Sequence, residues 1–191
     1  MSLAERLEQL ESDLLADPPR ISAYSEFPCA LFRYDPEEEW ALRRELQKLA
    51  TRIGNHGRTV RLVPLSELVW EAIEGAEGLE PVVELEAASG WEAAQEQVNI
   101  YLSDQDFSHL PSVLARHIDS LEPTPDCVFL WRAAALSPGF YLVSKLLDEL
   151  KGLLRAPTIL FYPGTLKGQD GLRFMGLSDR ETMANYRVKI Y

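Results

Sequence analysis

Cysteine, histidine and long apolar runs are scarce in this 191-residue chain. The two cysteines, Cys29 and Cys127, each lie near the start of a predicted strand. We expect buried free thiols in a reducing compartment rather than a disulfide. No apolar stretch approaches the roughly 20 residues that span a bilayer. Charged residues follow directly after Met1-Ser2-Leu3, where a signal peptide would be apolar. These absences predict a cytoplasmic protein without a membrane anchor.

Motifs for catalysis are also missing. The loop 164–168 follows a predicted strand and contains Lys167, but it has no Gly-Lys-Thr/Ser run and no helix signal follows it. Ser137 and Ser144 do not stand in a Gly-x-Ser-x-Gly elbow. The possible zinc ligands are not at ligand spacing: Cys29, Cys127, His56, His109 and His117. We therefore expect no cofactor, no metal and no enzymatic activity.

The charge of the chain is unevenly distributed around a net value of −11. Residues 151–191 carry seven basic and three acidic side chains, a balance of +4, so the first 150 residues carry −15. An acidic body disfavours DNA binding, because phosphate attraction supplies most of that affinity. Direct DNA binding is therefore not expected. The basic C-terminal region either forms a local patch for an anionic partner or consists of solvated loop residues.

The first 17 residues predict an acidic amphipathic helix. Its apolar stripe has alternating spacings of four and three residues, and Pro18-Pro19 ends it. The stripe either packs on the body of the protein or docks in the groove of a partner. Its members are Leu3, Leu7, Leu10 and Leu14.

Four apolar runs predict the strands of a parallel sheet, at 28–33, 59–63, 126–131 and 157–162. Helical patterns lie between them, at about 36–53, 65–76, 90–102, 111–121 and 139–154, and 75–90 is expected to be a loop with a possible short helix. The order predicts a single α/β domain over 1–191. Its architecture would be three-layer and Rossmann-like, with four mainly parallel strands and helices on both faces. Short edge strands at 172–175 and 186–190 would form a C-terminal tail.

Polar side chains follow three of these strands. Ligands of open α/β sheets bind at the carboxyl ends of the strands, which makes this edge the candidate anion or partner site. Two guanidiniums there could hold a carboxylate or phosphate. The alternative is an ion pair with Glu37, Glu38 or Glu39 at the start of the next helix. The candidate residues are Arg33, Tyr34, Arg132, Tyr162 and, from the tail, Arg187.

An ordered set of short segments resembles the BrxB family, a core component of bacterial BREX phage-defence systems. The segments are Tyr34-Asp35-Pro36-Glu37-Glu38-Glu39-Trp40, Val63-Pro64-Leu65-Ser66-Glu67-Leu68, Val128-Phe129-Leu130-Trp131-Arg132, Phe161-Tyr162-Pro163-Gly164 and Asn185-Tyr186-Arg187. The resemblance runs from about Ile21 to the end of the chain. Family members often have two adjacent tyrosines where this chain has Asn185-Tyr186.

The resemblance implies a role but no catalytic residues. It implies a non-catalytic adaptor that binds larger BREX components: a PglZ-type protein above all, an AAA-type ATPase and a DNA methyltransferase. The alternative is an enzyme or a nucleotide- or anion-responsive module that uses the arginines at the strand ends.

Overall fold

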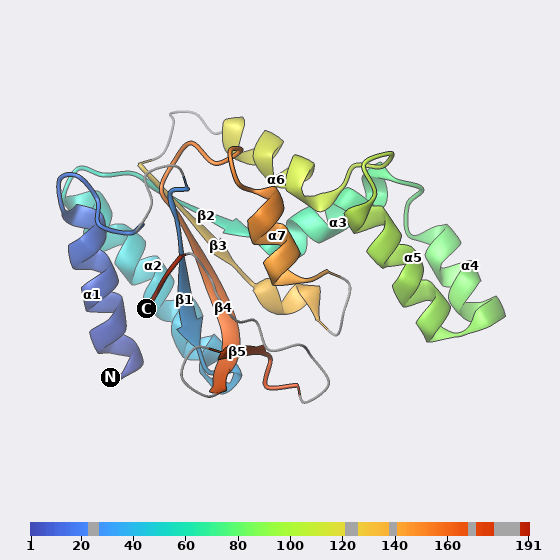
Figure 1. Ribbon diagram of the computed structural model, residues 1–191, viewed down its shortest axis with the longest axis horizontal. Coiled ribbons are helices and arrows are strands. Elements are labelled where there is room, and N and C mark those ends of the chain that lie inside the picture. The colour runs from blue at the N-terminus through green and yellow to red at the C-terminus, as the bar shows by residue number, and fades with distance from the viewer. Residues whose placement is uncertain (23–26, 121–125, 138–140, 168–170, 178–187) are drawn as a thin grey trace.

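A central, mostly parallel sheet organises the chain in the computed structural model, which describes residues 1–22, 27–120, 126–137, 141–167, 171–177 and 188–191 (Figure 1). Five strands lie side by side in the order β2-β3-β4-β1-β6, and all neighbouring pairs are parallel. A further strand, β5, pairs antiparallel with β4. The strands are β1 (Cys29–Tyr34), β2 (Val60–Pro64), β3 (Cys127–Trp131), β4 (Thr158–Lys167), β5 (Gly171–Phe174) and β6 (Lys189–Ile190).

Helices cover both faces of the sheet, which confirms the three-layer α/β prediction. On one face, here called the α1/α2 face, lie α1 (Leu3–Leu15) and α2 (Glu39–Asn55), preceded by the 3₁₀ helix η1 (Pro36–Glu38) (Figure 1). On the other, the α3 face, lie α3 (Leu65–Gly75), α6 (Leu110–Asp119), α7 (Val143–Glu149) and the 3₁₀ helix η2 (Ala133–Leu136). Asp35 and Glu38 form a capping box at η1.

Alternation along the strands divides the core between the two faces. In β1, Leu31 packs on the α3 face and Phe32 on the α1/α2 face, and in β3 the same holds for Leu130 and Phe129. The central strands are therefore apolar throughout, as a sheet covered on both sides requires. Five side chains of the predicted strands are fully buried: Phe32, Val128, Leu130, Ile159 and Phe161.

The strand β4 is longer than predicted. We expected Pro163-Gly164 to end it, but β4 continues to Lys167 and its outer half pairs with β5, with Gly164 opposite Phe174. A proline fits here because the pairing with β3 ends at Leu160, so its missing N–H removes no bond to that strand. The last strand, β6, is parallel to β1. Of the two strands in the C-terminal tail, β5 pairs antiparallel and β6 pairs parallel.

The helices on the far side of α3 also differ from the prediction. The segment expected to be a loop contains α4 (Glu80–Ser89), which pairs with α5 (Trp91–Ser103) in a hairpin that projects from the body (Figure 1). Trp91 is exposed at the start of α5. Helix α7 is shorter than predicted, so Leu142 precedes it and Leu153 follows it, and both side chains are exposed.

Candidate functional site

The fold places four of the predicted site residues at the carboxyl edge of the sheet. Arg33 and Tyr34 end β1, Tyr162 lies in β4 opposite Arg33, and Arg132 directly follows β3. Because β4 lies between β1 and β3, Tyr162 separates the two arginines along this edge. Arg187 lies outside the described residues.

Tyr34 is part of the structural core of the α1/α2 face. Its side chain is fully buried, and its hydroxyl donates a hydrogen bond to the Glu39 carboxylate. Arg43 donates from Nε to the other oxygen of Glu39 at 2.6 Å. Burial, then the contact with Glu39, raises the pKa of Tyr34. These contacts hold the start of α2 against the end of β1.

Arg33 is neutralised by a neighbour. Its Nη1 lies 3.0 Å from Asp35 Oδ1 and donates to the carbonyl of Gly164 at 3.4 Å. The predicted alternative of an ion pair is thus correct in kind but not in partner, because Asp35 takes the place of Glu37, Glu38 and Glu39. Glu38 lies instead 3.8 Å from Arg6 of α1. Arg33 therefore joins the end of β1 to the hairpin of β4 and β5.

Tyr162 lies buried on the α3 face. Its hydroxyl has no hydrogen-bond partner among the described residues, and burial raises its pKa. Its ring packs 5.3 Å from the ring of Phe174, centre to centre, and Gly164 covers its edge. A Cβ at Gly164 would come within 2.5 Å of the ring and of the Arg173 carbonyl oxygen, so the site requires glycine.

Arg132 leaves the sheet in a left-handed turn with φ of 57°. Its guanidinium carbon lies 4.6 Å from the centre of the Trp131 ring, which packs on the α1/α2 face. Alternation in β1 directs Arg33 to the opposite, α3 face. The two side chains therefore leave this edge toward opposite faces, and their binding of one ligand stays a prediction.

The edge contains two residues that the sequence analysis did not single out. Trp131 Nε1 and Arg173 Nε are buried and have no acceptor among the described residues, as is also true of Arg132 Nε. Sequence analysis missed Arg173 because its position at this edge depends on the pairing of β5 with β4. No local sequence pattern indicates that pairing.

The N-terminal leucine stripe belongs to the core of this protein. Leu7, Leu10 and Leu14 are buried against the α1/α2 face, and Leu3 packs partly against the same cluster. The helix is fixed further by Asp13, which accepts from the Tyr191 hydroxyl at 3.0 Å and from Lys189. The alternative in which this stripe docks on a partner is therefore wrong, because these side chains are already covered.

A second feature of the surface is its charge. Residues 62–115 contain eleven acidic side chains and neither lysine nor arginine, so this acidic segment carries the entire net charge of −11. The segment comprises α3, α4, α5 and the first part of α6. Five of its acids lie on the hairpin of α4 and α5, here called the arm: Glu80, Glu84, Glu86, Glu92 and Glu96.

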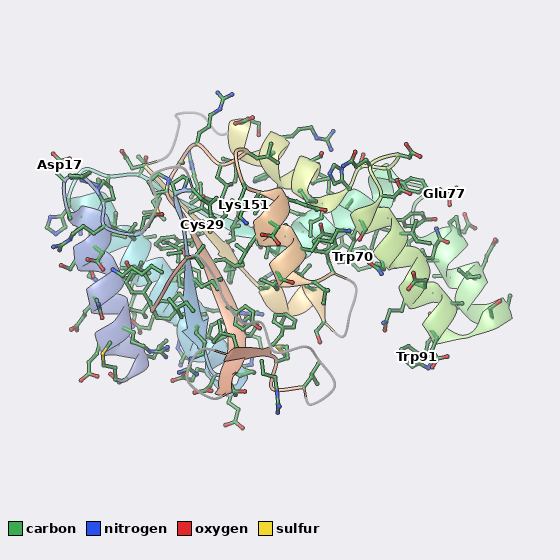
Figure 2. The ribbon with its side chains drawn as sticks, viewed as in Figure 1. Asp17, Cys29, Trp70, Glu77, Trp91 and Lys151 are labelled. Carbon is green, nitrogen blue, oxygen red and sulfur yellow. The ribbon has the colours of Figure 1, made fainter. Side chains whose placement is uncertain are left out.

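The arm exposes apolar side chains beside these acids. Trp91 is 61% exposed and Val83 54%, and Trp70 of α3 is 52% exposed. Figure 2 shows Trp91 at one end of α5 and Trp70 nearer the body. The arm is anchored by Tyr101, whose buried ring lies 5.2 Å from Phe107 and whose hydroxyl donates to Glu77 Oε2 at 2.5 Å. Its exposed face is thus both acidic and aromatic while its inner face is fixed.

Metal ligands and membrane-spanning helices were two further possibilities for this chain. Within the part of the chain that the structure describes, no three His, Cys, Asp or Glu side chains gather as metal ligands would. In the same residues, no helix is both long and apolar enough to cross a bilayer. Cys29 and Cys127 are buried free thiols, as predicted.

Comparison with known proteins assigns the chain to a family. A family model described as "BREX protein BrxB" matches residues 61–190, which include β3 to β6, the acidic segment and all of β2 except Val60. No curated protein and no solved structure matches the chain. The match covers more than half of the sequence and includes four of the five resembling segments, whereas the segment 34–40 lies before it. The chain therefore belongs to the BrxB family, a component of BREX phage-defence systems.

Proposed function

We propose that this protein is a non-catalytic adaptor in a BREX phage-defence complex and that it binds a larger component through the arm. The observation that carries the proposal is the composition of the arm, which projects from the body and bears five acidic side chains beside the exposed side chains of Trp91 and Val83. Family membership supplies the setting, because other BREX components are the expected partners.

The surface chemistry specifies the partner's side of the contact. An acidic surface steers a basic one and fixes its orientation, whereas affinity comes mainly from a few buried anchors. Tryptophan is among the residues most enriched as such anchors. Trp91 and Val83 would enter an apolar depression on the partner, surrounded by lysine and arginine. The same acidic surface would repel DNA, which agrees with a protein partner.

Among BREX components, the PglZ-type protein is the partner we propose first. This choice rests on the resemblance to the BrxB family, and an AAA-type ATPase and a methyltransferase are the other candidates. A defined contact on the arm also leaves the sheet and its carboxyl edge free.

Co-purification tests the proposal. The chain would be tagged and each BREX product expressed with it, with capture at low and at moderate salt. Glu80→Lys with Glu84→Lys reverses two exposed charges on α4, and Trp91→Ala removes the anchor. Each variant should lose the partner while its thermal unfolding temperature, Tm, stays within about 2 °C of the parent, because surface substitutions usually change stability little.

A matched control separates net charge from position. Glu8→Lys with Asp119→Lys makes the same change of charge at exposed positions outside the arm, on α1 and α6. The control should retain the complex. Equal loss of the partner in both double variants would show that the arm has no special role, and no capture of any BREX product by the parent would refute the adaptor function.

A further inference from the structure

Strands β3 and β5 pair with successive parts of the same edge of β4, β3 with its first part and β5 with its last part. Val128 of β3 donates to the Pro157 carbonyl, and Met175 at the end of β5 donates to the Pro163 carbonyl, each at 2.8 Å. Carbonyls of alternate strand residues point to the same side, so both partners lie on one side of β4. The ends of β3 and β5 thus approach each other head-on.

This arrangement places Arg132 and Arg173 near each other. Arg132 is two residues past Leu130, which is opposite Leu160, and Arg173 is opposite Thr165. Their levels along β4 differ by about three residues, or roughly 10 Å, which two arginine side chains can bridge. Leu172 and Phe174 pack on the α3 face, so Arg173 lies on the α1/α2 face, where Arg132 covers Trp131.

Three buried N–H donors lie in this place. Trp131 Nε1, Arg132 Nε and Arg173 Nε are buried, and none has a hydrogen-bond partner in the described part of the chain. A buried donor without a partner costs about 1–3 kcal/mol. All three atoms can only donate, so only a group that supplies acceptors can satisfy them together.

A second observation concerns the counter-ions of the same two arginines. Nearby Arg33 lies 3.0 Å from Asp35, and Arg43 lies 2.6 Å from Glu39. No carboxylate of the described residues lies within ion-pair distance of Arg132 or Arg173. Arg132 is held in a left-handed conformation, which is uncommon for a residue with a side chain. Within the described residues, this edge therefore has two arginines without an ion-pair partner and three buried N–H groups without an acceptor.

We propose that Trp131, Arg132 and Arg173 form a binding site for an oxyanion, a carboxylate or a phosphate group. Guanidinium groups bind both through paired N–H donors, and an indole N–H adds a third. The oxyanion belongs either to a free phosphorylated small molecule or to an acidic segment of a protein. The inference does not depend on the adaptor function, because the arm projects away from the part of the sheet that holds β5 (Figure 1).

Thermal unfolding of the full chain tests the site. Pyrophosphate and the acidic dipeptide N-acetyl-Asp-Glu are added separately, each against sodium chloride at the same ionic strength. At least one of them should raise the Tm of the parent and of the control Arg116→Gln, an exposed arginine on α6. The rise should disappear in Arg132→Gln and in Arg173→Gln, with at least tenfold weaker binding by calorimetry.

The pattern of responses identifies the source of the oxyanion. A response to pyrophosphate indicates a phosphorylated small molecule, and a response to the dipeptide alone indicates an acidic protein segment. No rise with either probe, or an equal rise in both arginine variants, would overturn the proposal. If Arg132→Gln does not fold, Arg173→Gln alone decides.

The unliganded variants give an independent result. Without ligand, Arg173→Gln should be at least as stable as the parent, because the substitution removes an unpaired, partly buried charge. A lower Tm for unliganded Arg173→Gln would show that this arginine serves the fold, and would also overturn the proposal. The variant with Glu80→Lys and Glu84→Lys should keep the response to the oxyanion whether or not it binds a BREX partner.

Discussion

Replacing Leu10 by alanine measures how firmly the N-terminal helix belongs to the body. The Leu10 side chain is fully buried among the residues of the α1/α2 face, which include Leu42, Leu46 and Phe32. Truncation of a buried leucine costs about 2–5 kcal/mol, through lost transfer free energy and the cavity that remains. For a chain of this size, 1 kcal/mol corresponds to about 2–4 °C in Tm. We therefore expect Tm to fall by about 4–20 °C.

The assay is urea unfolding followed by circular dichroism, together with a thermal scan. Gln9→Ala is the matched control, because Gln9 is exposed one position away on the same helix. The control should stay within about 0.5 kcal/mol of the parent. If Leu10→Ala unfolds at the same urea concentration as Gln9→Ala, the helix does not pack on α2 and β1, and the docking alternative for its leucines would return.

Two further predictions concern the sheet edge and the C-terminus. Gly164→Ala should destabilise the protein by about 1–3 kcal/mol in urea unfolding, because the new Cβ would overlap the Tyr162 ring and the Arg173 carbonyl; Gly54→Ala, where space is open, is the control and should not destabilise it. Asp13→Asn should cost about 1–3 kcal/mol at pH 6. Burial opposes the charge of Asp13, but hydrogen bonds from Lys189 and Tyr191 outweigh it and lower its pKa. The stabilisation is therefore present above the ordinary carboxylate pKa of about 4 and is lost as pH falls through the lower folded pKa, so the difference between parent and variant in urea unfolding should shrink toward pH 3. A difference independent of pH would contradict this account.

The parallel core was predictable because its signal is local. Strands covered on both faces need apolar side chains at every position, and runs such as Cys127–Trp131 supply them. The order of the strands was not predictable in the same way. The position of β1 between β4 and β6 depends on contacts between residues more than 120 positions apart, such as Ala30 with Ile159.

Helix α4 shows how local signals can mislead. Its segment contains Pro81 and is bounded by Gly78 and Gly90, which together resemble a loop. Pro81 instead occupies the first turn of the helix, where its missing N–H has no partner to lose, and Gly90, with φ of 90°, makes the turn into α5. Trp91 is exposed because it begins the second helix of this hairpin, which projects from the body into solvent.

The candidate site differs from the prediction for a topological reason. In open α/β sheets, a crevice forms where successive connections leave the strand ends toward opposite faces. Here β1 leads to α2 on one face and β3 leads to η2 and α7 on the other, so the crevice would lie around the end of β4. That place is occupied by β4 itself, which runs on into its pairing with β5 (Figure 1).

The added hairpin separates Arg33 from Arg132 and binds Arg33 through the Gly164 carbonyl. The hairpin also places Arg173 beside the last part of β4, beyond the point where the pairing with β3 ends. The oxyanion site that we propose at the strand ends therefore consists of Trp131, Arg132 and Arg173 rather than of Arg33 with Arg132.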